Sequence, residues 1–537
     1  MKAEGSIAYF CMEYGLDSSF KIYSGGLGIL AGDHLKAARD AKLPMVGIGI
    51  LWKQGYVEQH IDGDGKVVDC YRDIDRSHVE DTGLRVMVRI REDQVPVKVW
   101  KTEAFDNVPL YLLDTDVPES SYHWITRNLY GGNEEVRVAQ EIILGVGGVK
   151  VLRALKIPVK TYHFNEGHAV LAGLALIREK MDAGEDFYSA WRKTRRKIVF
   201  TTHTPVSAGN ESHSMTRLRY MGADQGFTIE QLAEIGGIPF NMTVAGLRLS
   251  RKTNAVSALH LETTQSMWRH IKGKSRIIHI TNGVHRTTWM DETFSREKLT
   301  PQEVADCHHK NKIELLQMIQ RQTGTSLNSD KLLIGFARRS TPYKRSGLIF
   351  DQEELMAPLL RSQRIQLVYA GKAHPMDENG KELLLFLSEQ QKKYPHSVVL
   401  LEGYDMEMGK TLTRGCDVWL NNPQRPKEAC GTSGMKAAMN GVLNASILDG
   451  WWAEACRHGE NGWAIGDEKV PKNENRQDRK DATALAKLLV ETIVPMYEQN
   501  RDVWNQMMCN SILDTRNQFS AARMVTEYAE EMYTNGA

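Results

Sequence analysis

The chain has 537 residues, more than one hydrophobic core usually spans, so we expect two large lobes. Its 68 Lys and Arg residues balance 67 Asp and Glu residues, which excludes binding to nucleic acid or an anionic membrane through overall charge. The seven cysteines include no C-x-x-C pair, which predicts free thiols in a reducing compartment and no zinc knuckle.

The first residues, MKAEGSIAYF, lack the charged and apolar regions of a signal peptide. No run of roughly 18 apolar residues follows anywhere in the sequence. We therefore expect a cytoplasmic protein without a membrane or nucleic-acid partner.

In chain order, short apolar runs alternate with longer helix-like segments, which is typical of parallel sheets covered by helices. The runs of the first half are 7–14, 44–51, 108–115, 161–165, 197–204 and 276–284. Within this half, HIDGDGK resembles the opening of a calcium loop, but Lys66 would occupy a ligand position. A hairpin turn is the better interpretation.

The second half repeats the pattern and predicts a second sheet. Its apolar runs are 332–337, 366–371, 397–403, 416–422 and 442–448. The predicted fold class is α/β, with two Rossmann-like, doubly wound lobes facing a central cleft. We expect an N-terminal lobe at 1–300, a C-terminal lobe at 301–510, and a C-terminal helix at 511–537 that can cross back to the first lobe.

Ligands of such sheets bind beyond the carboxyl ends of the strands, so the residues there are candidates. Gly25 and Gly26 precede a predicted helix and could present amide groups to an anion, although a plain tight turn fits equally well. Glu166, His168 and His203 follow two later strands. Their spacing does not match a zinc site, and hydrogen bonding to a polyhydroxylated ligand suits them better.

The first strand of the second half leads into ARRSTPYKR, which concentrates the cations Arg338, Arg339, Lys344 and Arg345. Arg and Lys together suit a site for two phosphate groups. The alternative is a solvated surface helix.

The stretch GTSGMK, from Gly431 to Lys436, contains glycines, hydroxyls and a lysine but lacks the Walker spacing. A helix start capped by Thr432 or Ser433 is one interpretation. Glu428 lies eight residues before Lys436. Many two-lobed nucleotide-sugar transferases have a second Glu at the position that Lys436 occupies here. An amine cannot accept a ribose hydroxyl proton, but it can react with an aldehyde cofactor.

Together, these motifs resemble the α-glucan (glycogen, starch and maltodextrin) phosphorylases, in the short microbial type without the N-terminal regulatory extension. The resemblance runs in order through SGGLGILAGDHLKAA, HFNEGH, FTTHTPV, TNAVSALH, ITNGV, ARRSTPYKR and KEACGTSGMKAAMNGVLNASILDG.

The resemblance implies a GT-B type fold and the reversible phosphorolysis of a terminal α-1,4-linked glucose, which yields α-D-glucose 1-phosphate with retention of configuration. It implies pyridoxal 5′-phosphate as cofactor. The residue spacing described above adds the expectation of no metal site. The implied partners are an α-1,4-glucan and inorganic phosphate, and a homo-oligomer is left open.

Site roles also follow from the resemblance. The catalytic set would be Lys344, Arg339, His203 and Lys436. The cofactor-binding set would be Lys436, Arg338, Thr432, Ser433, Gly25 and Gly26. The substrate-binding set would be Glu428, Tyr343, Asn254, His203, Gly431, Leu27, His168 and Glu166.

Several residues depart from the family pattern, including Ala255, Ala258, Asp405 and Cys430. Trp451 and Trp452 could stack on sugars, but core packing is the favoured interpretation. Two alternatives to the phosphorylase hypothesis remain open. One is a nucleotide-sugar-dependent glucan synthase of the same fold, and the other is a non-catalytic glucan-binding homologue.

Overall fold

The computed structural model describes residues 6–206, 209–471 and 473–534 of the chain. The chain divides into two compact units. Unit 1 comprises Met1–Tyr56, Tyr71–Thr281 and Ala521–Ala537, and unit 2 comprises Val57–Cys70 and Asn282–Ser520. Each unit contains its own α/β sheet, so the mixed α/β class with parallel sheets is confirmed.

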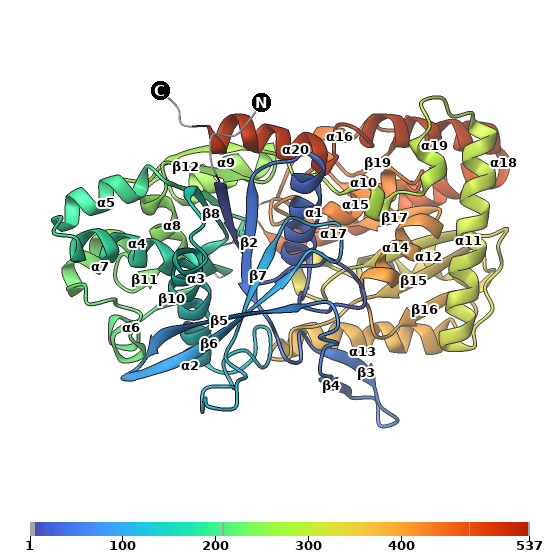
Figure 1. Ribbon diagram of the computed structural model, residues 1–537. Coiled ribbons are helices and arrows are strands. Elements are labelled where there is room, and N and C mark those ends of the chain that lie inside the picture. Colours follow the sequence, from blue (N-terminus) through green and yellow to red (C-terminus); the bar gives the residue numbers. More distant parts are fainter. Residues whose placement is uncertain (1–5, 207–208, 472, 535–537) are drawn as a thin grey trace. The chain divides into compact units, whose positions relative to one another are not determined.

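Within the described part of unit 1, nine strands form one sheet in the order β13-β12-β9-β8-β1-β2-β7-β6-β5 (Figure 1). The strands from β13 to β7 are parallel to their neighbours. Their bounds are β1 Ser6–Phe10, β2 Met45–Ile50, β7 Leu110–Asp114, β8 Val159–Asn165, β9 Ile198–Thr201, β12 Lys252–Ala255 and β13 Arg276–His279.

An antiparallel ribbon closes one edge of this sheet and differs from the all-parallel expectation. Strands β5 (Glu80–Ile90) and β6 (Asp93–Thr102) pair with each other, and β6 also pairs with β7. Every second residue of β5 faces solvent, so this strand is polar on one face and lacks the continuous apolar run of a buried parallel strand.

The helices of unit 1 connect and cover these strands. They are α1 Gly26–Asp40, α2 Glu134–Ile142, α3 Gly148–Ala154, α4 Leu171–Asp182, α5 Phe187–Arg195, α6 Met215–Met221, α7 Ile229–Gly236, α8 Met242–Leu249, α9 Ala258–Met267 and α20 Ala521–Tyr528. A short β10–β11 pair joins Ser212–His213 to Phe240–Asn241. Helix α20 contacts α1, so the end of the chain belongs to the first unit (Figure 1).

In the described part of unit 2, six strands form a parallel sheet in the order β16-β15-β14-β17-β18-β19. Their bounds are β14 Leu332–Ala337, β15 Ile365–Ala370, β16 Val398–Leu401, β17 Val418–Asn421, β18 Leu443–Ile447 and β19 Gly462–Ile465. Every residue of the first five strands is buried, which confirms the strands predicted from the apolar runs.

The helices of unit 2 are α10 Arg286–Trp289, α11 Pro301–Thr323, α12 Glu353–Arg361, α13 Glu378–Lys393, α14 Met406–Gly415, α15 Thr432–Ala438, α16 Trp452–Ala455, α17 Glu474–Leu488, α18 Val494–Gln499 and α19 Arg501–Thr515. The longest, α11, starts at a capping box between Thr300 and Glu303 and is followed by Gly324, whose φ is +72°.

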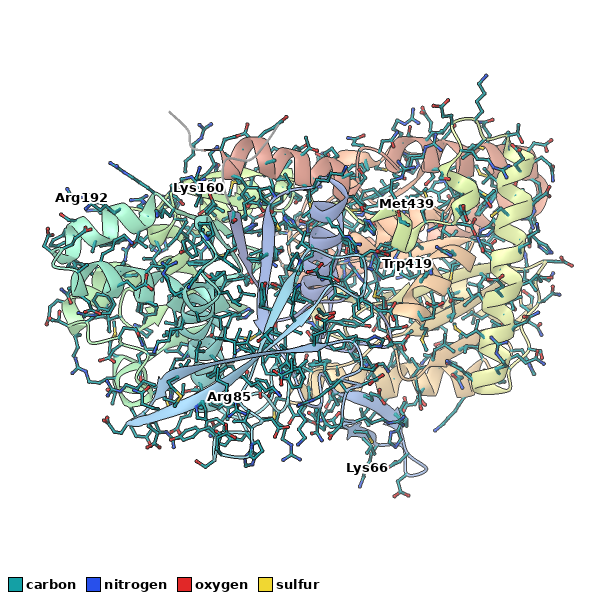
Figure 2. All side chains as sticks on the ribbon, viewed as in Figure 1. Lys66, Arg85, Lys160, Arg192, Trp419 and Met439 are labelled. Carbon is teal, nitrogen blue, oxygen red and sulfur yellow. The ribbon has the colours of Figure 1, made fainter. Side chains whose placement is uncertain are left out.

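The predicted hairpin at HIDGDGK is confirmed. Strands β3 (Glu58–Ile61) and β4 (Val67–Cys70) pair antiparallel, with exposed Lys66 at the tip (Figure 2). The side chain of Trp419, labelled in the same view, is fully buried among the strands of unit 2. Among the described residues, no helix is both long enough and apolar enough to cross a membrane.

Candidate functional site

A buried ion cluster in unit 2 joins three of the predicted site residues. The Nζ atom of Lys344 lies 2.9 Å from Oε2 of Glu428, and Nη2 of Arg338 lies 3.0 Å from the same oxygen. Burial alone would raise the pKa of Glu428, but Arg338 and Lys344 outweigh it and hold this pKa below its ordinary value. Glu428 is therefore an ionised carboxylate shared by two cations.

The positive charge near this cluster is not fully compensated. Arg338 follows β14 directly, and its Nη1 atom is buried without a hydrogen-bond partner among the described residues. Arg339 is exposed, and no described residue pairs with its guanidinium group. Lys344 ends a short 3-10 turn, with Nζ 4.9 Å from the centroid of the Tyr343 ring. These groups leave donors for an added anion.

Arg345 does not belong to this cluster, although the sequence groups it with the other cations. Its guanidinium donates to Asp478 at 2.8 Å, to Asp481 at 2.9 Å and to two backbone carbonyls. Because its charge is neutralised inside unit 2, the anion-binding set is smaller than the sequence predicts.

The conformation of GTSGMK explains its two glycines. Gly431 has φ +88°, which favours glycine, and it is the N-cap of α15, so neither Thr432 nor Ser433 caps this helix. A Cβ on Gly434 would lie 2.7 Å from the Asn444 side chain, so close packing requires glycine there. The Ser433 hydroxyl accepts a hydrogen bond from the Trp419 indole at 3.2 Å and keeps its own proton for another acceptor.

Lys436 lies on α15 and is buried in unit 2. Its Nζ atom lies 3.3 Å from the centroid of the Trp289 ring, at the end of α10. An amine held against an aromatic face in a buried position is chemically distinct from a solvated surface lysine. Trp289 belongs to none of the sequence motifs, so its contact with Lys436 was not predicted.

Asp449 is a second residue that the sequence analysis missed. It follows β18, and its two carboxyl oxygens accept the backbone N–H groups of Glu428 and Gly450, each at 2.9 Å. Burial raises the pKa of Asp449 to about 7, and the charge of Glu428 adds to the rise. Its place at a strand end is the signal that could have found it.

Trp451 and Trp452 follow directly, and each is only 1% exposed. Their rings contact each other, with centroids 5.1 Å apart. The favoured interpretation of core packing is confirmed.

In unit 1, the glycine-rich turn at the start of α1 is held by Glu13. The Glu13 carboxylate accepts the amide N–H groups of Ser24 at 2.6 Å and Gly25 at 3.1 Å, and the Tyr130 hydroxyl at 2.8 Å. The Gly25 amide is therefore occupied within the protein. A Cβ built on Gly25 or Gly26 would meet nothing within 4 Å, so both glycines border open space. Leu27 is half-buried next to it.

Glu166 and His203 lie side by side at the ends of β8 and β9. Oε2 of Glu166 accepts the His203 backbone N–H at 2.8 Å, and Nε2 of His203 lies 2.6 Å from Oδ1 of Asn165. Burial lowers the pKa of His203 to about 3, so the ring is neutral, donates from Nε2 and keeps Nδ1 as an acceptor. Glu166 has φ +76°, which is strained for a residue with a side chain.

His168 follows Glu166, and burial lowers its pKa to about 3 as well. Its Nε2 atom lies 4.0 Å from Oε2 of Glu211. The two neutral imidazoles and the Glu166 carboxylate form a polar group that unit 1 assembles without help from unit 2.

Asn254 is placed differently from the sequence expectation of a sugar contact. It is completely buried. Its amide donates to the Tyr528 hydroxyl at 2.7 Å and to the Ala255 carbonyl, and it accepts from Thr201 at 2.7 Å. These hydrogen bonds attach α20 to the sheet and use both amide protons of Asn254.

Comparison with known proteins adds an independent finding. Residues 291–487 match the model of the family described as carbohydrate phosphorylase. The chain is 36% identical to a maltodextrin phosphorylase of Thermococcus litoralis, over 99% of this chain and 71% of that protein. It is 36% identical to a glycogen phosphorylase of Mycobacterium tuberculosis, over 99% and 71%, and 33% identical to that of Aquifex aeolicus, over 98% and 86%.

The chain belongs to the α-glucan phosphorylase family.

The part of the chain that matches the family model contains the ion cluster, GTSGMK and Asp449. The phosphorylase relatives also extend over the glycine-rich turn, Glu166 and His203, which lie outside that match. The family resemblance stated from motifs is thus confirmed over nearly the whole chain, and it identifies the protein as a glycosyl-transferring enzyme.

Proposed function

We propose that the chain catalyses the reversible phosphorolysis of a terminal α-1,4-linked glucose of a glucan, yielding α-D-glucose 1-phosphate with retention of configuration. The observation that carries this proposal is the pairing of Glu428 with Arg338 and Lys344 in the part of unit 2 that also holds the buried Lys436. A carboxylate for sugar hydroxyls, cations for phosphate and an amine for a carbonyl cofactor are the groups that this reaction needs.

Pyridoxal 5′-phosphate fits these residues. Lys436 would bind it covalently through the aldehyde, and Arg338, Thr432 and Ser433 would bind its phosphate group. The unpartnered Nη1 of Arg338 and the unused proton of Ser433 supply donors for an anion. When bound, the cofactor would supply a phosphate group whose second pKa of about 6 suits proton exchange with inorganic phosphate.

The remaining roles follow from charge. Lys344 and Arg339 would hold inorganic phosphate, and their positive charge would offset the repulsion between two phosphate groups. Glu428 would then accept glucose hydroxyls, with Tyr343 and the backbone of Gly431 beside it. Asp449 would fix the backbone of Glu428 through the hydrogen bond to its N–H.

In unit 1, neutral His203 would contact the sugar near its anomeric carbon through the acceptor Nδ1. His168 and Glu166 would line the glucan side, with Glu166 acting mainly through the backbone that it holds. At the glycine-rich turn, Gly26 and Leu27 remain as amide donors, because the Gly25 amide already serves Glu13.

The finer fold proposal is the GT-B type, with two Rossmann-like lobes facing a central cleft. It is supported by the strand-end position of the candidate residues in each sheet taken separately. A cytoplasmic location is supported by the seven cysteines, all of which have free thiols.

The test combines an absorbance spectrum with a phosphorolysis assay on maltooligosaccharides of graded length. We expect the purified chain to carry a pyridoxal chromophore, which borohydride fixes on Lys436, and to release glucose 1-phosphate. Lys436→Ala should lose both, whereas Lys392→Ala, at an exposed position of α13, should lose neither.

Activity that survives Lys436→Ala would refute the proposal. Glucan elongation from ADP-glucose, with none from glucose 1-phosphate, would replace it with the synthase alternative. Glycogen binding without any phosphate chemistry would point to the non-catalytic alternative.

A further inference from the structure

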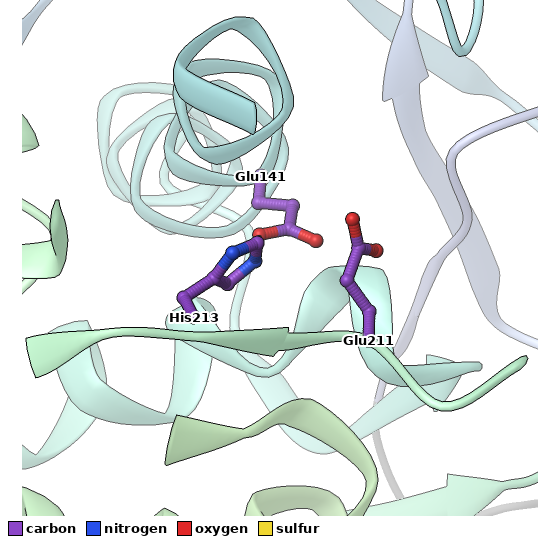
Figure 3. Close-up of side chains that lie close together, drawn as sticks. All are labelled: Glu141, Glu211 and His213. Carbon is purple, nitrogen blue, oxygen red and sulfur yellow. The ribbon is translucent and has the colours of Figure 1, made fainter. Parts of the chain in front are cut away.

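A buried cluster in unit 1 contains two carboxyl groups and an imidazole that the proposed reaction does not use. Glu141 lies on α2, and Glu211 and His213 lie at strand β10 (Figure 3). One oxygen of each carboxyl group and one ring nitrogen lie within 4.8 Å of one another. Glu141 is completely buried.

The hydrogen bonds of this cluster leave one oxygen unaccounted for. Nε2 of His213 lies 2.8 Å from Oε2 of Glu141. Arg137 donates to both oxygens of Glu211, at 2.8 and 3.2 Å. Oε1 of Glu141 is buried, receives no hydrogen bond from any described residue, and faces the Glu211 carboxyl group (Figure 3).

Two ionised carboxylates at this separation repel each other strongly when they are buried. Arg137 pairs with Glu211, and Glu141 raises the pKa of His213 against the effect of burial, so His213 and Glu141 compete for the proton that compensates the second carboxylate. A proton on Oε1 of Glu141 removes the repulsion, because the protonated oxygen can donate a hydrogen bond to the Glu211 carboxylate. We propose that Glu141 and Glu211 share one proton, and that this pair is a positioning device for the neighbouring residues of the candidate site.

A divalent metal ion is the competing explanation, because two carboxylates and a His can be ligands. Arg137, however, already occupies both oxygens of Glu211, and a cation bound there would lie next to its guanidinium group. The contacts therefore favour a proton.

The electrostatic environment agrees with the contacts. Burial raises the pKa of Glu141 to about 8, and Glu211 adds to the rise. Burial works in the same direction on Glu211, but Arg137 outweighs it and lowers that pKa to about 2. The titratable and charged groups that face the pair are Arg137, His213, His168 and Glu166, and Tyr130 faces Arg137. At neutral pH, the shared proton therefore resides on Glu141.

The pair is connected to the residues proposed to bind substrate. Glu211 lies 4.0 Å from His168. Arg137, held by Glu211, lies over the Tyr130 ring at 4.5 Å from its centroid, and Tyr130 donates to Glu13, which holds the Gly25 amide. Loss of the proton would loosen Glu211 and, through Arg137, the glycine-rich turn.

The test uses Glu141→Gln, since the amide reproduces the protonated state. Its oxygen can accept from His213 and its nitrogen can donate to Glu211 at every pH. The control is Glu134→Gln, which makes the same change on the same helix at a mostly exposed side chain.

The first measurement is infrared difference spectroscopy of the cofactor-loaded protein at pH 7. We expect a protonated-carboxyl carbonyl band in the wild type that disappears in Glu141→Gln and persists in Glu134→Gln. Absence of a band that depends on Glu141 would overturn the proposal.

The second measurement is the Tm as a function of pH. Because Glu141 binds its proton more tightly in the folded chain, its stabilisation is lost as the pH rises from about 4.5 to about 8. The Tm of the wild type relative to Glu141→Gln should therefore fall over this range and become constant above it. Parallel curves for the two proteins would contradict the shared proton.

The third measurement tests for a metal ion with Zn²⁺, Mn²⁺ and EDTA. We expect that Zn²⁺, Mn²⁺ and EDTA cause no change in the Tm of the wild type that is absent in Glu141→Gln. If Zn²⁺ or Mn²⁺ raises the Tm and this rise requires Glu141, the site binds a metal ion and the proposal is wrong.

The consequence for catalysis rests on the proposed function. The phosphorolysis rate should fall in the wild type above pH 8 more steeply than in Glu141→Gln. The infrared and Tm results do not depend on activity. If the infrared and Tm results are as expected but the protein shows no phosphorolysis, the shared proton is supported and the proposed function is wrong.

Discussion

The Nζ atom of Lys344 and the Oε2 atom of Glu428 lie 2.9 Å apart inside unit 2. In the proposed reaction, these two groups bind different substrates, the phosphate and the sugar. Each must exchange its partner for a ligand, so phosphate that engages Lys344 would remove one of the two cations that hold Glu428 and make this carboxylate more available to glucose. By linkage, the two substrates should bind with positive cooperativity.

Glu428→Gln tests this relationship. The substitution leaves Arg338 and Lys344 without a counter-charge, so the Tm should fall, because breaking a buried ion pair costs about 3–5 kcal/mol. Added phosphate should recover part of the loss and bind about tenfold tighter than to the wild type, a change of about 1.4 kcal/mol. Thermal shift titrations with phosphate measure this, and Glu474→Gln, which breaks the exposed pair with Lys427, is the control. Weaker phosphate binding in Glu428→Gln would refute the exchange.

Asp449→Asn tests the buried carboxyl group behind Glu428. The folded-state pKa of Asp449, about 7, is above the ordinary value of about 3.9, so its protonation favours the folded chain. This stabilisation is complete below pH ~4 and is lost as the pH rises through ~7, at up to about 1.4 kcal/mol per pH unit. The Tm of the wild type relative to Asp449→Asn should decline over that range. Exposed Asp330→Asn should show no such decline.

Tyr528→Phe tests the placement of Asn254. The variant loses the hydroxyl that accepts from Asn254, and an unpaired buried amide should cost about 1–3 kcal/mol of stability. The KM values for glucan and phosphate should not change, and exposed Tyr220→Phe is the control. A higher KM for glucan at unchanged stability would contradict this structural role and support the predicted contact between Asn254 and the sugar.

Glu166→Ala and Glu166→Gly form a matched pair that isolates backbone strain. Both variants lose the carboxylate that holds the His203 backbone, so both should lower the phosphorolysis rate. Only Gly relaxes at φ +76°, where strain amounts to about 1–3 kcal/mol. We therefore expect the Gly variant to unfold at a higher urea concentration than the Ala variant. The opposite order would show that the backbone at 166 is unstrained.

The sequence predicted the buried parallel strands well, because continuous apolar runs such as 332–337 have few other interpretations. It missed β5 and β6, whose alternating polar face gives no such run. It also missed two parallel strands, β12 and β19, each of which is only four residues long and contains polar residues or glycine. It also grouped Arg345 with the other cations, because these positively charged residues belong to one short motif. Only the three-dimensional contacts with Asp478 and Asp481 reveal where that charge is used.

The candidate site divides in the same way. The sequence predicted three charged site residues, Glu428, Lys344 and Arg338, because they lie in motifs that follow parallel strands. It did not predict that Glu428 pairs with both cations. Trp289 and Glu141 could not be recognised, because their roles depend on burial and on partners far along the chain. The prediction for Asn254 came from a motif, and the packing of Tyr528 against it has no sequence signature.

The contribution of Tyr528 and Tyr533 to unit 1 has a consequence for biosynthesis. Both side chains hydrogen-bond to residues of the N-terminal part of unit 1, Tyr528 to Asn254 and Tyr533 to His163 at 2.8 Å. A ribosome therefore completes Asn282–Ser520, most of unit 2, before it has made the last residues that the first unit needs. The N-terminal unit, although synthesised first, would be the last to reach its native state, and a nascent chain that stalls before residue 528 would keep its central polar residues exposed to chaperones and proteases.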